Sequence, residues 1–296
     1  MYIEQLQKYK PKLGLYLPIP LAFLGLMIYN YLSTANIDTA KLMHEYIKLL
    51  GENTTFLLLI APFVVFLIGL LLYNRHIQHN SIRLLTTSRA KIDWHRIFFS
   101  FASWSVFLIV STLLSIWLMP QDFVWNFKPV PFFSFLVLAF VFIPFQTSFE
   151  EYLFRAHILQ GLGLATHTRW VPLLVTSVLF GLMHAANPEV EKMGFIIMLY
   201  YIGTGLFLGI LTLMDEGLEL ALGFHAANNL IGALLLTSDW SALQTNSLFK
   251  DVSEPQVMLQ VVLPIVLIYP LLLVVFAKKY KWKNWSQKLL GSLQTS

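Results

Sequence analysis

Residues 56–73 read FLLLIAPFVVFLIGLLLY and contain no charged side chain. An α-helix rises about 1.5 Å per residue, so this stretch would extend about 27 Å, close to the ~30 Å hydrocarbon core of a bilayer. The run is too uniformly apolar for a strand of a membrane β-barrel, where lipid-facing and interior residues alternate. The stretch therefore predicts a membrane-spanning helix.

Further apolar stretches of similar length occur on both sides of this one. With it, the candidate spans are 13–33, 56–73, 97–118, 132–153, 170–186, 194–214, 218–236 and 257–277. Stretches four to seven are less pure, because they carry charged, amide, imidazole and glycine residues. We expect an all-α fold, a polytopic transmembrane helical bundle of about eight spans, as a single domain over residues 1–296.

The overall composition supports a membrane protein. Hydrophobic residues make up 57% of the chain and charged residues 12%, whereas a soluble domain carries about 25% charged residues. The lipid bilayer is therefore the expected solvent and partner. The chain has no cysteine, which excludes disulfides, thiolate metal sites and cysteine nucleophiles.

Charge placement predicts the orientation of the bundle. With eight spans and a cytoplasmic N-terminus, the inside segments hold 14 Lys and Arg residues and the outside loops hold five. The positive-inside rule then places both termini in the cytoplasm. Five of the basic residues lie in the 74–96 loop, where we expect headgroup contact and no nucleic-acid binding. Seven tryptophans near predicted span ends are expected interfacial anchors: Trp94, Trp104, Trp117, Trp125, Trp170, Trp282 and Trp285.

The segment FEEYLFR, residues 149–155, places ionisable groups at the end of the fourth stretch. Such groups in a span cost several kcal/mol unless they are paired or hydrated, so they indicate function. Glu151 and Arg155 have the spacing and order of a helical ion pair. Glu150 points about 100° away, so we expect that the two carboxylates do not share a partner. The structural alternative is that both glutamates lie at a helix end and meet water.

The segments FGLMHAANP, residues 180–188, and GFHAANN, residues 223–229, supply imidazole and amide groups. His184 closes a span that Asn187 and Pro188 end. His225 and Asn229 share a helix face because they are four residues apart. Each pattern alone also fits a hydrogen-bonded residue that only packs helices together.

Together, these groups suit hydrolysis of an acyl group. Glu150 would take a proton from water, a histidine would position that water, and His225 with Asn229 would stabilise the oxyanion. A metal site is a second reading, in which Glu150, His184 and His225 hold a divalent metal such as zinc. Neither an H-E-x-x-H helix nor a G-x-S-x-G elbow is present.

The ordered triple E-E-x-x-x-R, F-x-x-x-H and H-x-x-x-N resembles the CAAX-protease and bacteriocin-processing family of intramembrane proteases, also called Abi or type II CAAX prenyl endopeptidases. The resemblance covers a catalytic core of about residues 130–240. It implies that Glu150 activates water, His184 helps to hold it, and His225 with Asn229 binds the oxyanion. Glu151 and Arg155 become a supporting pair. The family is commonly labelled metalloprotease, and a metal-free mechanism is preferred here because Asn229 suits an oxyanion donor better than a zinc ligand.

The resemblance implies a peptide or protein substrate at the membrane, prenylated or not, and a peptidase activity. A bacterial inner-membrane location is expected from composition. Two other functions stay open: an ion- or proton-coupled transporter that uses the same charged groups, and a non-catalytic bacteriocin-immunity membrane protein in which they only pack.

Overall fold

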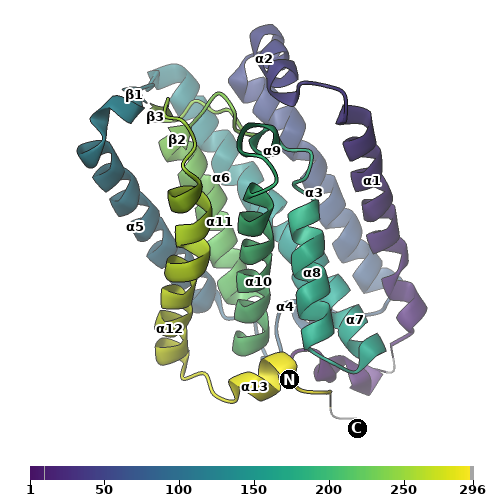
Figure 1. The fold of residues 1–296 in the computed structure, drawn as a ribbon. Helices are drawn as coiled ribbons and strands as arrows, with labels where there is room; N and C mark the ends of the chain where they lie inside the picture. The colour runs from purple at the N-terminus through teal and green to yellow at the C-terminus, as the bar shows by residue number, and fades with distance from the viewer. Residues whose placement is uncertain (10, 294–296) are drawn as a thin grey trace.

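The protein folds into a bundle of helices, seen in the computed structural model of residues 1–9 and 11–293 (Figure 1). Lys10, one of the basic residues of the predicted cytoplasmic N-terminus, and residues 294–296 lie outside the described residues. The α-helices are α1 Pro18–Thr34, α2 Thr39–Leu50, α3 Glu52–His76, α4 Ile82–Thr86, α5 Trp94–Leu118, α6 Pro129–Glu151, α7 Leu159–Thr166, α8 Trp170–Leu182, α9 Pro188–Met193, α10 Ile197–Asp215, α11 Glu219–Leu235, α12 Tyr269–Tyr280 and α13 Trp285–Leu290.

Shorter elements complete the chain. Three turns are 3₁₀-helical, at Glu4–Tyr9, Leu13–Tyr16 and Pro120–Asp122. Three segments are π-helical, at Tyr152–Ile158, Met258–Val262 and Pro264–Ile268. The strands β1 Phe123–Trp125, β2 Leu236–Thr237 and β3 Phe249–Asp251 form a small sheet in the order β1-β3-β2. Strand β3 pairs antiparallel with β1 and parallel with β2.

The predicted all-α, polytopic membrane fold is confirmed. Among the described residues, six helical segments are long and apolar enough to cross a bilayer: Leu13–Thr34, Glu52–His76, Trp94–Leu118, Pro129–Thr166, Ile197–Asp215 and Met258–Tyr280. The fifth and seventh predicted spans correspond to α8 and α11, which have 13 and 17 residues. The count of eight spans and the cytoplasmic placement of the termini stay predictions.

Large apolar side chains face outward along the helices. Val65 is 68% exposed, Trp117 is 76% exposed and Val130 is 77% exposed. A water-soluble bundle would hide such residues in its core, whereas in a bilayer they face hydrocarbon. Helix α1 contains no buried residue at all, so it borders the bundle with lipid-facing and cavity-facing sides.

Two helix pairs form the tightest contacts around the site. Helix α8 packs on α10, where a Cβ at Gly205 would lie 2.8 Å from the Ser177 carbonyl oxygen. Helix α11 packs on α5, where a Cβ at Gly223 would overlap the Ile97 carbonyl oxygen. Because both glycines lack a side chain, the backbones approach closely, as is common in membrane bundles.

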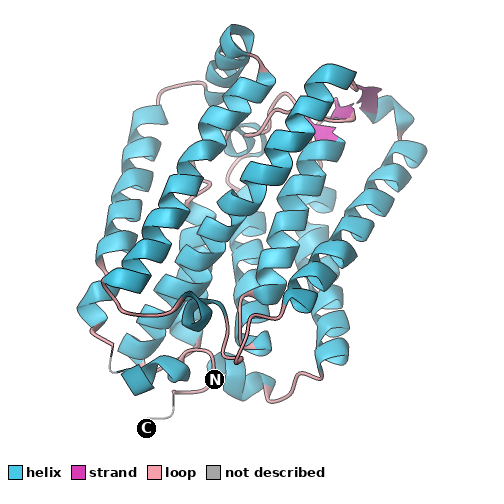
Figure 2. Ribbon diagram, turned by 180° about the vertical axis from the view of Figure 1, so that it is seen from behind, coloured by secondary structure: helices cyan, strands magenta, loops and turns pink. Residues whose placement is uncertain are grey.

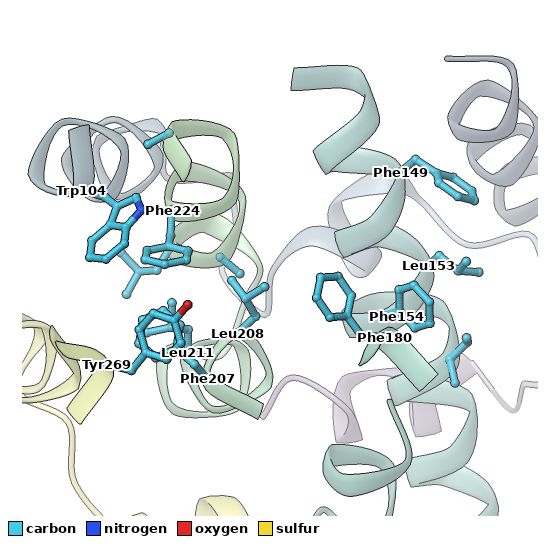
Figure 3. Packing of buried hydrophobic residues seen from close by; sticks show 14 of the residues in the cluster. Trp104, Phe149, Leu153, Phe154, Phe180, Phe207, Leu208, Leu211, Phe224 and Tyr269 are labelled. Atoms are coloured by element: carbon cyan, nitrogen blue, oxygen red, sulfur yellow. The ribbon is translucent and has the colours of Figure 1, made fainter. Parts of the chain in front are cut away.

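Aromatic side chains fill the space between these pairs (Figure 3). Phe207 stacks on Tyr269 with ring centroids 4.5 Å apart, and Trp104 lies 4.5 Å from Phe224. Trp104 is only 5% exposed, so its prediction as an interfacial anchor is wrong. Position near a span end does not distinguish an anchor from a core residue, because the helix face decides which one it is.

The N-terminus and α13 lie at one end of the bundle (Figures 1 and 2). This end is closed by buried side chains and ion pairs. Tyr2 and Leu6 are buried there. Arg89 lies 3.0 Å from an oxygen of Asp215 and 3.1 Å from an oxygen of Glu219. The expectation that the basic 74–96 loop serves lipid headgroups is therefore wrong for Arg89, which ties this loop to the α10–α11 connection.

The opposite end carries the strands, α2 and α9 (Figures 1 and 2). Helix α8 stops early on its way to this end, because Asn187 and Pro188 start a new short helix, α9. At 1.5 Å per residue, its 13 residues rise about 20 Å. The bundle is thus incomplete beside α8, and a cavity occupies the space.

Candidate active site

Glu150 and Glu151 lie within one continuous helical segment and not at a helix end. Helix α6 passes directly into the π-helical segment Tyr152–Ile158 and then α7, so helix runs without a break from Pro129 to Thr166. The alternative in which both glutamates meet water at a helix end is therefore wrong: Glu150 is 3% exposed and Glu151 is fully buried. Single π-helical turns within α-helices are frequent at functional sites.

The predicted ion pair between Glu151 and Arg155 is present. Arg155 Nη1 donates to Glu151 Oε1 over 3.1 Å, and both side chains are completely buried. Arg155 also donates to the Gly205 carbonyl oxygen, and its guanidinium lies 4.1 Å from the centroid of the Phe180 ring. The arginine thus joins α6, α8 and α10 around a buried carboxylate.

His225 lies between the two carboxylates. Its Nδ1 is 2.7 Å from Glu151 Oε1, and its Nε2 is 3.6 Å from Glu150 Oε2. The expectation that the two glutamates do not share a partner is wrong, because the two nitrogens of one imidazole face carboxylates that diverge from adjacent positions on a helix. Since an ionised carboxylate only accepts hydrogen bonds, Glu151 orients the ring with Nδ1–H toward itself.

Glu150 and Asn229 are joined through a chain of hydrogen bonds that begins at Trp104. The indole Nε1 of Trp104 donates to Asn228 Oδ1, and Asn228 Nδ2 donates to Asn229 Oδ1, each over 3.1 Å. Asn229 Nδ2 donates to Gln146 Oε1 over 3.1 Å, and Gln146 Nε2 donates to Glu150 Oε1.

The two ends of this Trp104–Glu150 chain fix its direction. An indole nitrogen can only donate and an ionised carboxylate can only accept, so each amide between them has one orientation that satisfies both neighbours. Asn229 consequently turns its NH₂ group toward Gln146 and retains a second N–H for another acceptor. Glu150 Oε2, by contrast, is buried and has no hydrogen-bond partner.

His184 occupies a separate position on the edge of the site. Its Nδ1 is 2.8 Å from the Phe180 carbonyl oxygen, and its ring stacks on Tyr201 with centroids 4.3 Å apart. The Phe180 ring lies next to both imidazoles, 5.1 Å from His184 and 5.9 Å from His225. Within residues 1–9 and 11–293, no hydrogen bond or ion pair joins His184 to Glu150.

A cavity of about 890 Å³ connects these groups to the end of the bundle that carries the strands. Glu150, His184 and Asn229 line it, together with Gln146 and Asn228. Its other wall is apolar and comes from α1 and α3, with Phe23, Leu26, Met27, Leu59, Phe63 and Phe66. Because this wall includes the lipid-bordering helix α1, an apolar segment within the membrane fits beside the polar groups.

Three residues of the site were not predicted from the sequence: Gln146, Asn228 and Trp104. Gln146 precedes Glu150 by four residues, the same helical spacing that identified the Glu151 pair, so this signal was available. Asn228 lies off the His225 face, and its role depends on an indole from α5. Only the contact of α5 with α11 brings that indole within reach.

The three candidate metal ligands Glu150, His184 and His225 do not form a metal-binding cluster. Within the described part of the chain, no group of three or more His, Asp and Glu side chains could hold a metal ion. Nδ1 of His225 is bonded to Glu151 and Nδ1 of His184 to the Phe180 carbonyl, which leaves both Nε2 atoms free, as in histidines that bind a metal. In this arrangement, however, the described side chains do not gather into a three-ligand zinc centre, and the proposed reaction uses no metal.

Residues 129–231 match the model of a known protein family, described as type II CAAX prenyl endopeptidase Rce1-like. This segment is therefore similar to that family, and it is called the Rce1-like segment below. The resemblance inferred from the three motifs is confirmed, and the Rce1-like segment contains all six motif residues, Glu150, Glu151, Arg155, His184, His225 and Asn229. The match supports an intramembrane, CAAX-protease-like function in general and a peptide or protein substrate at the membrane.

One relative is also similar beyond this segment. A protein of Bacillus subtilis (strain 168), described as the uncharacterized protein YyaK, is 28% identical over 229 residues, which is 76% of this chain and 74% of the relative. No solved structure matches the chain. The membrane-embedded character of the protein follows from its apolar helices and from the Rce1-like segment together.

Proposed function

We propose that this protein is an intramembrane endopeptidase in which Glu150 activates water for attack on a peptide bond. The observation that carries the proposal is the state of the Glu150 carboxylate. One oxygen accepts from Gln146, and the other is buried without a partner in a residue that lines the cavity. A buried acceptor without a partner is costly, so a water bound there would satisfy it and be held for reaction.

The orientation of the His225 ring supports its role. Glu151 holds Nδ1, and Nε2 is turned to the side of Glu150 Oε2, 3.6 Å away, where the attacked carbonyl would lie. A proton on Nε2 would let the ring donate toward the developing oxyanion, while Nδ1–H stays with Glu151. Asn229 would supply a second donor from its free N–H.

The reaction then proceeds in two steps. The water oxygen attacks the carbonyl carbon as Glu150 accepts a water proton, which gives a tetrahedral oxyanion beside His225 and Asn229. The carbon–nitrogen bond breaks as Glu150 returns the proton to the leaving nitrogen, which releases an amine and a carboxylic acid. His184, on the cavity edge, would position water or the substrate carbonyl before attack.

The supporting shell keeps this geometry rigid. Arg155 balances Glu151, and Glu151 fixes the His225 ring, so loss of either charge would release the imidazole. We extend the proposal to a catalytic core formed by the Rce1-like segment within one transmembrane domain, with both termini in the cytoplasm of a bacterial cell. Under that orientation the cavity, which faces the end opposite the termini, would open toward the outer surface of the membrane.

The test uses purified protein in proteoliposomes and a library of membrane-derived peptides read by mass spectrometry. Peptides lost with the wild type and kept with Glu150→Gln define substrates. Glu150→Gln keeps the bond from Gln146 and the shape of the side chain but cannot accept a proton. We expect a rate loss of about 10²–10⁴, the usual contribution of a general base. Glu191→Gln, an exposed carboxylate outside the site, serves as the control. Wild-type cleavage by folded Glu150→Gln would exclude the proposed mechanism.

A further inference from the structure

The cavity extends beyond the reacting groups to a second carboxylate, which is partly buried. Glu189, on the short helix α9, lines the same cavity as Glu150 and His184. Its Oε1 accepts from the backbone N–H of Ala242 over 2.7 Å, whereas its Oε2 is buried and has no hydrogen-bond partner. The carboxylate is thus only half satisfied, and the steps proposed for hydrolysis do not use it.

The basic residue on the same short helix is turned to another partner: Lys192 pairs with Glu254 over 2.8 Å. Burial raises the pKa of Glu189 above its ordinary value, although the Ala242 N–H opposes the shift. A carboxylate in this state gains most from a cation that arrives from the cavity.

The charged residues that line the cavity all have the same sign. They are Glu150, Glu189 and Asp251, and no Lys or Arg is among the described lining residues. The chain as a whole has 20 Lys and Arg against 16 Asp and Glu, so this lining does not follow from composition. Asp251 is partly exposed, and its Oδ1 accepts from the backbone and hydroxyl of Ser253. Among the described lining carboxylates, Glu189 is therefore the one besides Glu150 that has a buried oxygen without a hydrogen-bond partner.

Aromatic groups line the same cavity as Glu189. Trp240 and Tyr201 line the cavity, and Tyr201 stacks on His184. Such rings pack against the aliphatic stem of a lysine or the plane of an arginine and attract the cation. The chemistry of this end of the cavity, aromatic with one free carboxylate, complements a basic side chain next to an apolar segment.

We propose that Glu189 binds a lysine or arginine side chain of the peptide substrate and so selects apolar segments that carry a basic residue near the scissile bond. This inference rests on the proposed peptidase function and names its substrate class. Glu189 follows His184 by five residues, so the two Cα atoms lie no more than about 18 Å apart. An extended peptide covers about 3.3 Å per residue, which places the basic residue within about five residues of the cleaved bond.

The test measures binding of two fluorescent peptides to the purified full chain in a neutral detergent. Both contain the same Leu/Ala segment, and they differ at one terminal position, which is Lys in one and norleucine in the other. We expect the Lys peptide to bind the wild type about tenfold more tightly, the worth of one charge-assisted hydrogen bond. Glu189→Gln should remove this preference, because its amide keeps an acceptor for Ala242 but loses the charge. Glu191→Gln, two residues away and exposed, should retain it.

Equal affinity of the two peptides for the wild type would overturn the proposal without any variant. An unchanged preference in Glu189→Gln would overturn it as well, and unchanged binding of the norleucine peptide shows that this variant is folded. The outcome is independent of the Glu150→Gln test. Loss of the Lys preference alone leaves the peptidase standing, and cleavage by Glu150→Gln leaves the Glu189 result standing.

Discussion

Gln146 offers the sharpest test of the Trp104–Glu150 chain, because it occupies the link between Asn229 and Glu150. We consider Gln146→Met. Methionine has a side chain of similar length and is also a good helix former, but it cannot form either hydrogen bond. The Asn229 NH₂ group then loses its acceptor, and Glu150 Oε1 loses its donor.

The magnitude follows from the two bonds that are lost. A hydrogen bond to a charged group contributes about 1.5–3 kcal/mol, and one between neutral groups about 1 kcal/mol. If the bond to Glu150 serves to hold the carboxylate for proton transfer, its loss appears in the barrier. Since about 1.4 kcal/mol is tenfold in rate, kcat should fall about ten- to hundredfold, with little change in KM.

The assay compares initial cleavage rates of a substrate defined by its dependence on Glu150. Gln160→Met is the matched control, because Gln160 lies on the same continuous helix, is fully buried, and donates to the Leu84 carbonyl oxygen over 3.0 Å. Gln160→Met should lower the free energy of unfolding by about as much as Gln146→Met does, but it should keep the wild-type kcat. Wild-type kcat in folded Gln146→Met would refute the orienting role of the chain.

A double variant separates orientation from general loosening. Because the hydrogen bonds run in series, breaking the chain at Asn228 after it is already broken at Gln146 should cost little more activity. We expect Gln146→Met/Asn228→Ala to match Gln146→Met alone in kcat, a clear failure of additivity. If instead the kcat losses of the two single variants multiply in the double variant, the two residues act separately.

Three further outcomes follow from the structure. Glu151→Gln should lower the free energy of unfolding by about 3–5 kcal/mol, measured by denaturation in detergent, because Arg155 remains buried without its counter-charge. Gly205→Ala should cost about 1–3 kcal/mol, since the new methyl group meets the Ser177 backbone, while Gly25→Ala, which meets nothing within 4 Å inside helix α1, should keep or slightly raise the stability. EDTA should leave the cleavage rate unchanged; a loss that added zinc restores would contradict the metal-free reading.

Much of the site could be predicted from the sequence, because residues four positions apart on a helix lie on the same face. The i,i+4 relation of Glu151 and Arg155 fixed their pairing, and the placement of ionisable groups in apolar stretches identified Glu150 and His225 as unusual. The sequence did not reveal that His225 lies between both carboxylates. Distances between separate helices depend on how those helices pack, and the side-chain pattern of one helix carries no measure of them.

The errors have the same origin. Trp104 was expected at the interface and lies in the core, where it donates to Asn228. Arg89 was expected at the headgroups and is held by Asp215 and Glu219. In each case the position along the chain was known from the sequence. The surroundings of the side chain were decided by a partner from another segment of the chain.

The sequence alone determined that the chain is a helical membrane protein, because long stretches without charge leave no other solvent and no other backbone structure that satisfies its own hydrogen bonds. It also determined which polar groups needed an explanation. The tertiary structure decided how those groups meet: the packing of α11 on α6 brings His225 and Asn229 within bonding distance of the α6 side chains, and the contact of α5 with α11 adds the Trp104 indole. It also decided that a cavity remains where α8 ends, because a void exists only where neighbouring helices do not fill the space.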